Sequence, residues 1–212
     1  MAIVVANAPL RWTDELVRIV RSADLVVAAD GGANHLARIG VRPVAVVGDL
    51  DSIRPEVRAW LGERLLVPRP DQDHTDLDKT LSWVIDERGA RRVTVLGATG
   101  GRLDHALENL ALLARWSERA EVELRDAATR VVAVCATAVL SVAPGSTVSL
   151  LPAGRCERVW TEGLRWPLAG EPLDLLARTG ISNQATGEHV SLRVEGGTLL
   201  VFLATTGGEA ES

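Results

Sequence analysis

Residues 24–40 read DLVVAADGGANHLARIG, and this stretch decides the fold class. The apolar run Asp24–Ala29 is typical of a buried strand, and it ends at Asp30-Gly31-Gly32. A short helical segment, Ala33–Ile39, follows and stops at Gly40, a residue type that commonly ends helices. The stretch therefore predicts a buried strand that leads through a glycine turn into a helix.

The same strand-then-helix pattern recurs along the first half of the chain. The other apolar runs are Ala2–Ala6, Pro43–Val47, Leu65–Val67 and Arg92–Leu96, and helical segments follow Thr13, Arg54, Thr75 and Arg102. Strands that are apolar throughout and alternate with helices are typical of a mostly parallel sheet covered on both faces. We therefore expect an N-terminal α/β domain.

The pattern changes near residue 120, where short strand-like runs replace the helices. These runs are Glu121–Arg125, Arg130–Cys135, Ala138–Val142, Thr147–Leu151, Glu157–Thr161, Gly187–Val194 and Thr198–Leu203. Short strands at this spacing, separated by Pro- and Gly-containing turns, are typical of an antiparallel β-sandwich. We expect an α/β catalytic domain over residues 1–127 and a β-sandwich over residues 128–212, with a frayed tail at 207–212.

Composition limits the possible partners. The chain has 212 residues and a net charge of −5, which argues against nucleic-acid binding through general electrostatics. No apolar run approaches the length of a membrane span, and the first residues lack the basic segment of a signal peptide. Cys135 and Cys156 form no C-x-x-C motif and suit a reducing compartment. We expect a cytoplasmic protein that binds neither nucleic acid nor membrane.

An acidic segment lies near the middle of the α/β half, where residues 71–79 read DQDHTDLDK. Thr75 is a suitable helix N-cap, and Asp78 is placed to reach back to it. Asp76 and Lys79 lie three apart and share a helix face. Acids gathered in this way repel one another and favour a hard cation, Mg²⁺ or Ca²⁺. The alternative is an acidic helix start on a solvated surface.

Acidic residues follow four of the expected strands. They are Asp30, then Asp49 and Asp51, then the segment 71–78, then the loop 99–104. Ligands of open α/β sheets bind outside the carboxyl ends of the strands. This regularity favours a functional site over a solvated surface.

Several familiar sites are absent from the sequence. There is no P-loop, and no G-x-G-x-x-G follows the first strand. The segment from Asp71 begins like an EF-hand loop but has Asp76 where glycine is required and Ser82 in place of the final Glu. The histidines lack zinc-like spacing; we expect His35 on a helix surface, and His105 either orients a carboxylate or simply packs.

The remaining inventory is a carboxylate- and glycine-rich crevice with two basic residues, Lys79 and Arg102. The pairs Gly31-Gly32 and Gly100-Gly101 allow the backbone to approach a phosphate closely, although each pair is also explained by a tight turn. Acids that hold Mg²⁺, with cations that neutralise phosphate oxygens, are the means of phosphoryl-type transfer without a P-loop.

Five segments together resemble the thiamine pyrophosphokinase (thiamine diphosphokinase) family. They are ADGGAN at 29–34, GDLDSI at 48–53, DQDHTD at 71–76 with Lys79, GGRLDH at 100–105 and GISN at 180–183. The resemblance implies that a diphosphoryl group passes from ATP to the hydroxyl of thiamine, giving thiamine diphosphate and AMP, with Mg²⁺ as cofactor. It also implies a catalytic α/β domain, a thiamine-binding β-sandwich, and a homodimer whose active site lies between subunits.

The resemblance assigns roles to individual residues. The metal and diphosphate acids would be Asp49, Asp51, Asp73 and Asp76, with Lys79, Arg102 and Asp104 near the transferred group. The nucleotide site would include Asp30, Gly31, Gly32, Asn34, Thr75, Gly100 and Gly101, and the thiamine side Ser182 and Asn183. We expect in-line attack of the thiamine hydroxyl on the β-phosphorus, with Asp76 or Asp104 as candidate proton acceptor.

One departure concerns the acceptor. Animal members of the family carry a tryptophan, against which thiamine packs, shortly after the Ser-Asn pair. This chain continues instead with Gln184-Ala185-Thr186-Gly187. Trp160 and Trp166 either substitute for it or are ordinary core or interface residues.

Three other functions stay open from the sequence. They are a diphosphokinase with another acceptor such as a hydroxymethylpterin, a regulatory protein that binds nucleotide or thiamine without turnover, and a Ca²⁺-stabilised structural module. The motif at 163–168 followed by GISN argues against the first, and the full set of acids argues against the second.

Overall fold

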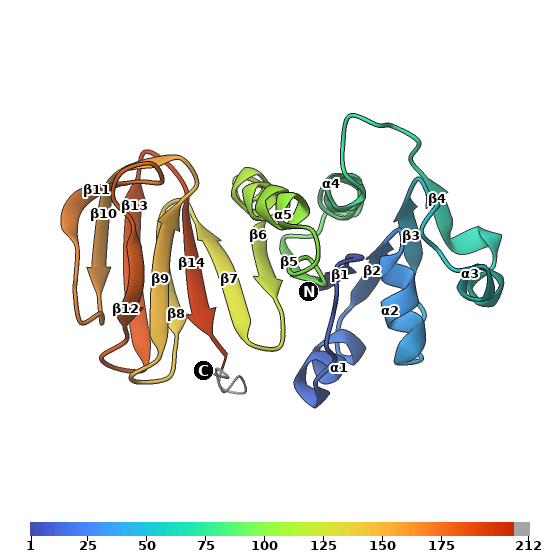
Figure 1. Ribbon diagram of the computed structural model, residues 1–212, viewed down its shortest axis with the longest axis horizontal. Helices are drawn as coiled ribbons and strands as arrows, with labels where there is room; N and C mark the ends of the chain where they lie inside the picture. The colour runs from blue at the N-terminus through green and yellow to red at the C-terminus, as the bar shows by residue number, and fades with distance from the viewer. Residues whose placement is uncertain (206–212) are drawn as a thin grey trace. The chain divides into compact units, whose positions relative to one another are not determined.

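The computed structural model describes residues 1–205, so the expected tail at 207–212 lies outside the described residues. The chain forms two compact units (Figure 1). The first contains residues 1–112 and 119–127, and the second contains residues 113–118 and the chain from Ala128 onward.

The first unit is built on a parallel sheet. Its strands are β1 (Ala2–Val5), β2 (Leu25–Ala29), β3 (Ala45–Gly48), β4 (Leu66–Pro68), β5 (Arg92–Leu96) and β6 (Glu121–Arg125). They lie in the order β6-β5-β1-β2-β3-β4, and every neighbouring pair is parallel. The predicted α/β fold class is therefore confirmed.

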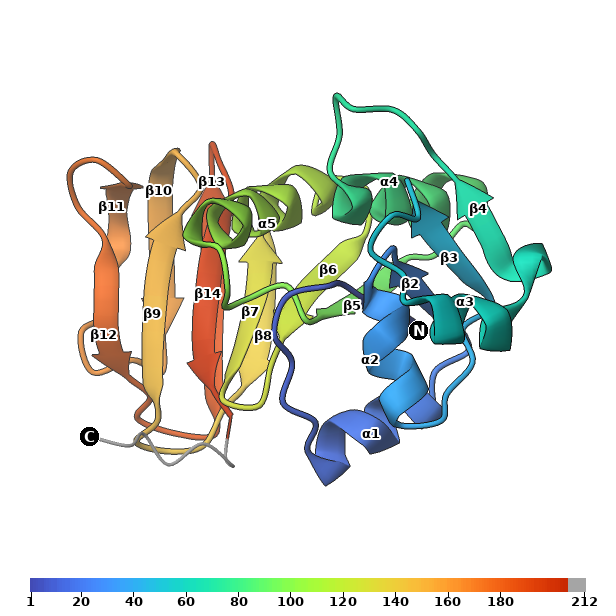
Figure 2. The same cartoon turned by 45° about the vertical axis from the view of Figure 1, so that its right-hand side comes forward.

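Helices cover both faces of this sheet. They are α1 (Asp14–Arg21), α2 (Gly32–Arg38), α3 (Pro55–Leu61), α4 (Asp76–Ser82) and α5 (Leu103–Trp116), with short turns η1 (Glu63–Leu65) and η2 (Trp83–Glu87). Figure 2 shows α4 on one side of the sheet and α1 and α2 on the other. The sheet is buried between them because its strands are apolar on both faces, as Ile3, Val27 and Val47 illustrate.

Capping side chains start two helices at the predicted residues. The Thr13 hydroxyl accepts from the Leu16 N–H at 3.2 Å, and the Thr75 hydroxyl accepts from the Asp78 N–H at 3.3 Å. The helix from Asp76 does not run as one α-helix to Arg88, because the π-helical turn η2 replaces its last part.

Strand β6 corrects one prediction. The sequence places Glu121–Arg125 among the antiparallel runs, but the strand pairs in parallel with β5, Arg92 opposite Glu121. Only Val122 and Leu124 of β6 are buried. Because one face is apolar and the other polar, its pattern alternates as in an antiparallel strand.

The second unit is a two-layered antiparallel structure, as predicted. Its strands are β7 (Thr129–Val134), β8 (Thr137–Ser141), β9 (Thr147–Pro152), β10 (Arg155–Glu162), β11 (Ala169–Asp174), β12 (Gly180–Gln184), β13 (His189–Glu195) and β14 (Leu199–Ala204). Within this unit the strand orders are β12-β9-β14-β7 and β11-β10-β13-β8. The core includes Leu150, Val159, Leu173, Leu192 and Val201.

Over the described residues, the helices are all too short or too polar to cross a membrane.

Candidate active site

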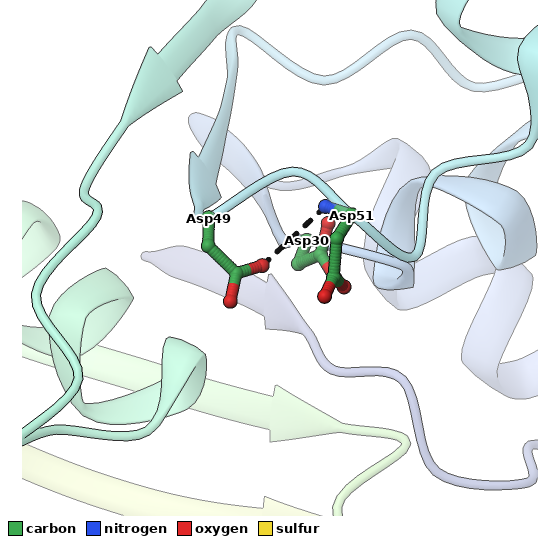
Figure 3. Close-up of side chains that lie close together, drawn as sticks. All are labelled: Asp30, Asp49 and Asp51. Atoms are coloured by element: carbon green, nitrogen blue, oxygen red, sulfur yellow. Dashed lines mark hydrogen bonds between the residues drawn. The ribbon is translucent and has the colours of Figure 1, made fainter.

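Three acids from two separate loops meet beyond the carboxyl ends of β2 and β3. Figure 3 shows the side chains of Asp30, Asp49 and Asp51 together. One carboxylate oxygen from each lies within 4.8 Å of the others. The Asp51 N–H donates to Asp49 Oδ1 at 3.4 Å, the dashed line in the figure. Asp49 and Asp51 are exposed, whereas Asp30 is 2 % exposed.

Asp30 presents an oxygen that the protein does not satisfy. Its Oδ2 accepts from the Ser52 N–H at 3.1 Å. Its Oδ1 is buried and has no hydrogen-bond partner among residues 1–205. Burial raises the pKa of Asp30, the Ser52 hydrogen bond opposes this, and the negative charge of Asp76 raises it further. A cation beside Oδ1 would offset both the burial of the carboxylate and its repulsion by Asp76.

Gly48 brings a fourth acid into contact with this group. A Cβ on Gly48 would lie 2.9 Å from Asp30 Cβ and 2.9 Å from Asp76 Oδ1, so the position has no room for a side chain. The Asp49 N–H donates to Asp76 Oδ1 at 3.2 Å. Helix α4 therefore packs against the end of β3 closely enough for Asp76 to join the acids.

Lys79 supplies a positive charge at the same place. Its Nζ lies 3.2 Å from Asp76 Oδ1, and its side chain is 6 % exposed. A lysine this deeply buried needs a partner for its charge, and Asp76 provides it. The three-residue spacing on α4 thus yields the pair that the sequence predicts.

Asn34 holds the acidic loop in place. Its Nδ2 donates to the Ser52 carbonyl at 2.9 Å, and its Oδ1 accepts from the Arg54 N–H at 3.0 Å. The sequence places Asn34 in the nucleotide site, but these two bonds commit its amide to the loop that follows β3. The Ser52 hydroxyl in turn donates to Asp51 Oδ1 at 2.9 Å.

Asp73 is not gathered with the other acids. It lies in an exposed loop, where its N–H donates to Asp71 Oδ1 at 3.0 Å. Asp71 Oδ2 lies 2.6 Å from His74 Nδ1. The pKa of Asp71 is lowered by the Asp73 N–H and by His74, and the pKa of His74 is raised by its bond to Asp71. The structure thus groups Asp30 with Asp49 and Asp51. The sequence instead places Asp73 with Asp49 and Asp51 among the metal-binding acids.

The loop after β5 reaches the same edge of the sheet. Gly100 and Gly101 have φ of +80° and +66°, values that favour glycine. Beyond them Arg102 forms an exposed two-point ion pair with Asp104, at 3.2 and 2.5 Å. This pairing lowers the pKa of Asp104 to about 2, so the paired carboxylate is a poor proton acceptor.

Two residues near the glycine turn were missed or misplaced by sequence reasoning. Asn7 follows β1, and a Cβ on Gly31 would lie 2.4 Å from its side chain. A lone asparagine after a strand carries no sequence signal of such a contact. His35 is buried rather than on a helix surface, and burial and the charge of Arg38 lower its pKa.

The GISN segment lies in β12 of the second unit. Ser182 has φ of +60°, and its N–H donates to Ser149 Oγ at 3.0 Å. Asn183 is buried, and its amide binds the backbone of Trp166. Trp166 is largely exposed and Trp160 half-buried, so neither is a fully buried core residue.

Comparison with known proteins decides the family. The family model described as "Thiamin pyrophosphokinase, catalytic domain" matches residues 16–124, and "Thiamin pyrophosphokinase, vitamin B1 binding domain" matches residues 138–199. The chain belongs to the thiamine pyrophosphokinase family. These matches confirm the resemblance drawn from the five segments.

Individual thiamine pyrophosphokinases are similar over varying lengths. Thiamine pyrophosphokinase 1 of rice is 36% identical over 154 residues, which cover 59% of this chain and 55% of the rice protein. The Bacillus subtilis enzyme is 34% identical over 113 residues, 52% of each chain. The matched stretch thus spans about half the length of these two relatives. Thiamine pyrophosphokinase 2 of Arabidopsis thaliana is 26% identical, covering 90% of this chain and 81% of the relative.

Solved structures of the family share the whole fold. Thiamine pyrophosphokinase from Bacillus subtilis superposes with a TM-score of 0.85 at 24% identity, covering 97% of this chain and 99% of the other. The Geobacillus thermodenitrificans protein gives a TM-score of 0.84 at 25% identity, covering 100% and 99%. The two-part α/β and β-sandwich architecture is therefore that of this family.

Proposed function

We propose that this protein transfers a diphosphoryl group from ATP to the hydroxyl of thiamine, giving thiamine diphosphate and AMP. The observation that carries the proposal is the meeting of Asp30, Asp49 and Asp51 beside the Asp76–Lys79 pair, in a chain of this family. The vitamin B1 binding model over residues 138–199 supports thiamine over a hydroxymethylpterin as acceptor.

The donor set suits Mg²⁺. Asp30, Asp49 and Asp51 offer only carboxylate oxygens, the ligand type that Mg²⁺ prefers, and Asp30 Oδ1 is buried without a partner among the described residues. These three residues would hold the ion. Bound Mg²⁺ would neutralise phosphate oxygens and make the β-phosphorus more electrophilic.

The chain's own groups would position the reactants. Lys79 is held by Asp76 beside the acids, where it can balance charge on the transferred group. Gly100 and Gly101 lie in an exposed turn with positive φ, where backbone N–H groups can approach phosphate oxygens, and Thr75 begins the helix that carries Asp76. Gly31 and Gly32 are buried, so their part in the nucleotide site is to let the turn after β2 pack closely. Of the two candidate proton acceptors, Asp104 is disfavoured because its pairing with Arg102 lowers its pKa to about 2, which leaves Asp76.

The remaining assignments rest on the family. Asp73, Arg102, Ser182 and Asn183 belong to segments that resemble the family's substrate-binding motifs. A homodimer is part of the proposal, supported by the exposed leucines Leu103 and Leu107, which lie four apart on α5. Light scattering on the purified protein would report the molar mass. A cytoplasmic location is also proposed, from two cysteines that form no disulfide.

The test measures AMP release from ATP and Mg²⁺ with and without thiamine, followed by mass detection of the product. We expect AMP and thiamine diphosphate to appear in equal amounts and only when thiamine is present. AMP release with a pterin alcohol but not with thiamine would overturn the acceptor. Binding of ATP without any AMP release would overturn the enzymatic function.

A further inference from the structure

The side-chain amide of Asn183 is hydrogen-bonded to the backbone of the protein. Its side chain is buried, and Oδ1 accepts from the N–H groups of Trp166, at 3.1 Å, and Gln184, at 2.9 Å. Its Nδ2 donates to the Trp166 carbonyl at 2.7 Å. The amide therefore binds both backbone groups of Trp166, as a partner strand would.

Backbone hydrogen bonds also join the residues just before Trp166 to the residues just after Asn183. Leu164 and Ala185 form an antiparallel bridge, and the Arg165 N–H donates to the Gln184 carbonyl at 2.8 Å. The Thr186 N–H donates to the Gly163 carbonyl at 2.9 Å. Residues 163–166 are thus fixed along residues 183–186 over their whole length.

The indole of Trp166 projects from this fixed backbone into solvent. Trp166 is 56% exposed, although burying a tryptophan would be strongly favourable. The Arg165 guanidinium lies 4.9 Å from the centroid of its ring and further orders it. The protein therefore holds a large aromatic side chain in place, with Arg165 over the ring and more than half of its surface exposed, which favours a planar ligand as its partner.

We propose that Trp166 is the aromatic residue against which bound thiamine packs, and that Asn183 positions it. The inference rests on the proposed function and names the residue that recognises the acceptor. Thiamine offers two flat rings, of which the aminopyrimidine is neutral and the thiazolium is cationic. Because Arg165 already places positive charge at the indole, the aminopyrimidine ring is the better partner.

Trp166 would also supply the aromatic surface that this chain lacks directly after its Ser-Asn pair. Gln184-Ala185-Thr186 occupies the positions that follow the pair, and this segment instead carries the loop that presents Trp166. Asn183 would then act through Trp166 and would not touch thiamine itself.

The first experiment compares Trp166→Ala and Trp166→Phe with wild type in the steady-state assay. We expect Trp166→Ala to raise the KM for thiamine by about tenfold, with Trp166→Phe in between and with kcat and the KM for ATP within about twofold. The matched control is Trp160→Ala, which removes another tryptophan stacked on an arginine, Arg193 at 4.7 Å, in the same unit. An unchanged KM for thiamine in Trp166→Ala, or an equal rise in Trp160→Ala, would overturn the proposal.

The second experiment separates the positioning role of Asn183 from direct binding. We expect Asn183→Ala to raise the KM for thiamine in the wild-type background and to have no further effect in the Trp166→Ala background. Equal effects in both backgrounds would show that Asn183 contacts thiamine independently and would overturn its positioning role. Melting temperatures of all variants would confirm that each is folded.

Calorimetric titration with thiamine keeps this inference distinct from the proposed function. A wild-type protein that binds thiamine but releases no AMP would refute the enzymatic function, while weaker binding by Trp166→Ala would still support the inference. A wild-type protein that binds no thiamine would refute both.

Discussion

At the scale of single residues, the acids of the candidate site differ in what else they do. Asp51 is exposed, and its carboxylate accepts a hydrogen bond from the neighbouring Ser52 hydroxyl. Asp76 instead balances the charge of the buried Lys79. Neutralising these two acids should therefore affect activity alike and stability differently.

Asp51→Asn removes one carboxylate charge and keeps an oxygen that can accept from Ser52. We expect the rate of AMP formation to fall roughly 100-fold or more, because a metal ligand is weakened. The melting temperature should stay within about 1 °C, since exposed polar substitutions of this kind change stability little. Asp14→Asn, an exposed acid in the first turn of α1, is the control and should keep full activity. Near-normal turnover in Asp51→Asn would remove this residue from the metal site.

Asp76→Asn leaves the Lys79 ammonium buried without its counter-charge. We expect loss of turnover together with a destabilisation of about 2 kcal/mol, or roughly 4–8 °C in melting temperature for a chain of this size. The double variant Asp76→Asn with Lys79→Met should recover most of the lost stability and remain inactive. Recovery of activity in the double variant would contradict the roles given to both residues.

Gly48 offers a test of how tightly the acids are packed. Its Cβ would clash with Asp30 and Asp76, whereas a Cβ on Gly40, which also has positive φ, would meet nothing within 4 Å. Gly40→Ala should cost about 1 kcal/mol of stability from backbone strain alone and keep its activity. Gly48→Ala should lose both stability and activity. Equal behaviour of the two variants in a melting and activity assay would show that the acids tolerate displacement.

At the scale of elements, the sequence predicted the strands and helices whose patterns are set by burial on both sides. β1 and β2 are apolar throughout because helices cover the sheet, and α1 and α4 begin at capping threonines. Strands β11 and β12 escaped prediction. Each lies at the edge of its layer within the second unit and contains residues unusual in central strands, Pro172 in β11 and Gly180 in β12.

Weakening the N-cap of helix α4 should disturb the site residues that this helix carries. Thr75→Ala removes the hydroxyl that accepts from the Asp78 N–H, and should cost about 1 kcal/mol of stability. Because Asp76 is the first residue of this helix and pairs with Lys79, the KM for ATP should also rise several-fold. Thr13→Ala removes the equivalent cap of α1 and should lower stability similarly without changing the KM for ATP. A Thr75→Ala enzyme with unchanged KM would show that the first turn is held by other contacts.

At the scale of the whole molecule, strand order explains why the site was predictable in outline. Parallel strands place their carboxyl ends at one edge, so acids after β2 and β3 had to be neighbours once the order was β1-β2-β3-β4. Which acids share one ligand was not predictable, because it depends on loop conformations without periodicity. Asp30, with φ of +42°, turns its carboxylate toward Asp49, whereas Asp73 remains in its own exposed loop. The hydrogen bonds of the Asn34 and Asn183 amides to backbone groups could not be predicted from the sequence either.

The most direct test of the metal site uses Mn²⁺ as a spectroscopic substitute for Mg²⁺. Electron paramagnetic resonance would measure Mn²⁺ bound by wild type and by Asp30→Asn in the presence of a non-hydrolysable ATP analogue, with Asp73→Asn as the matched comparison. The geometry predicts that Asp30→Asn weakens Mn²⁺ binding at least about tenfold, because Asp30 Oδ1 is a buried oxygen without a hydrogen-bond partner among the described residues. Asp73→Asn should change Mn²⁺ binding less than about threefold. Unchanged binding in Asp30→Asn with loss in Asp73→Asn would contradict the site as it is drawn from Asp30, Asp49 and Asp51.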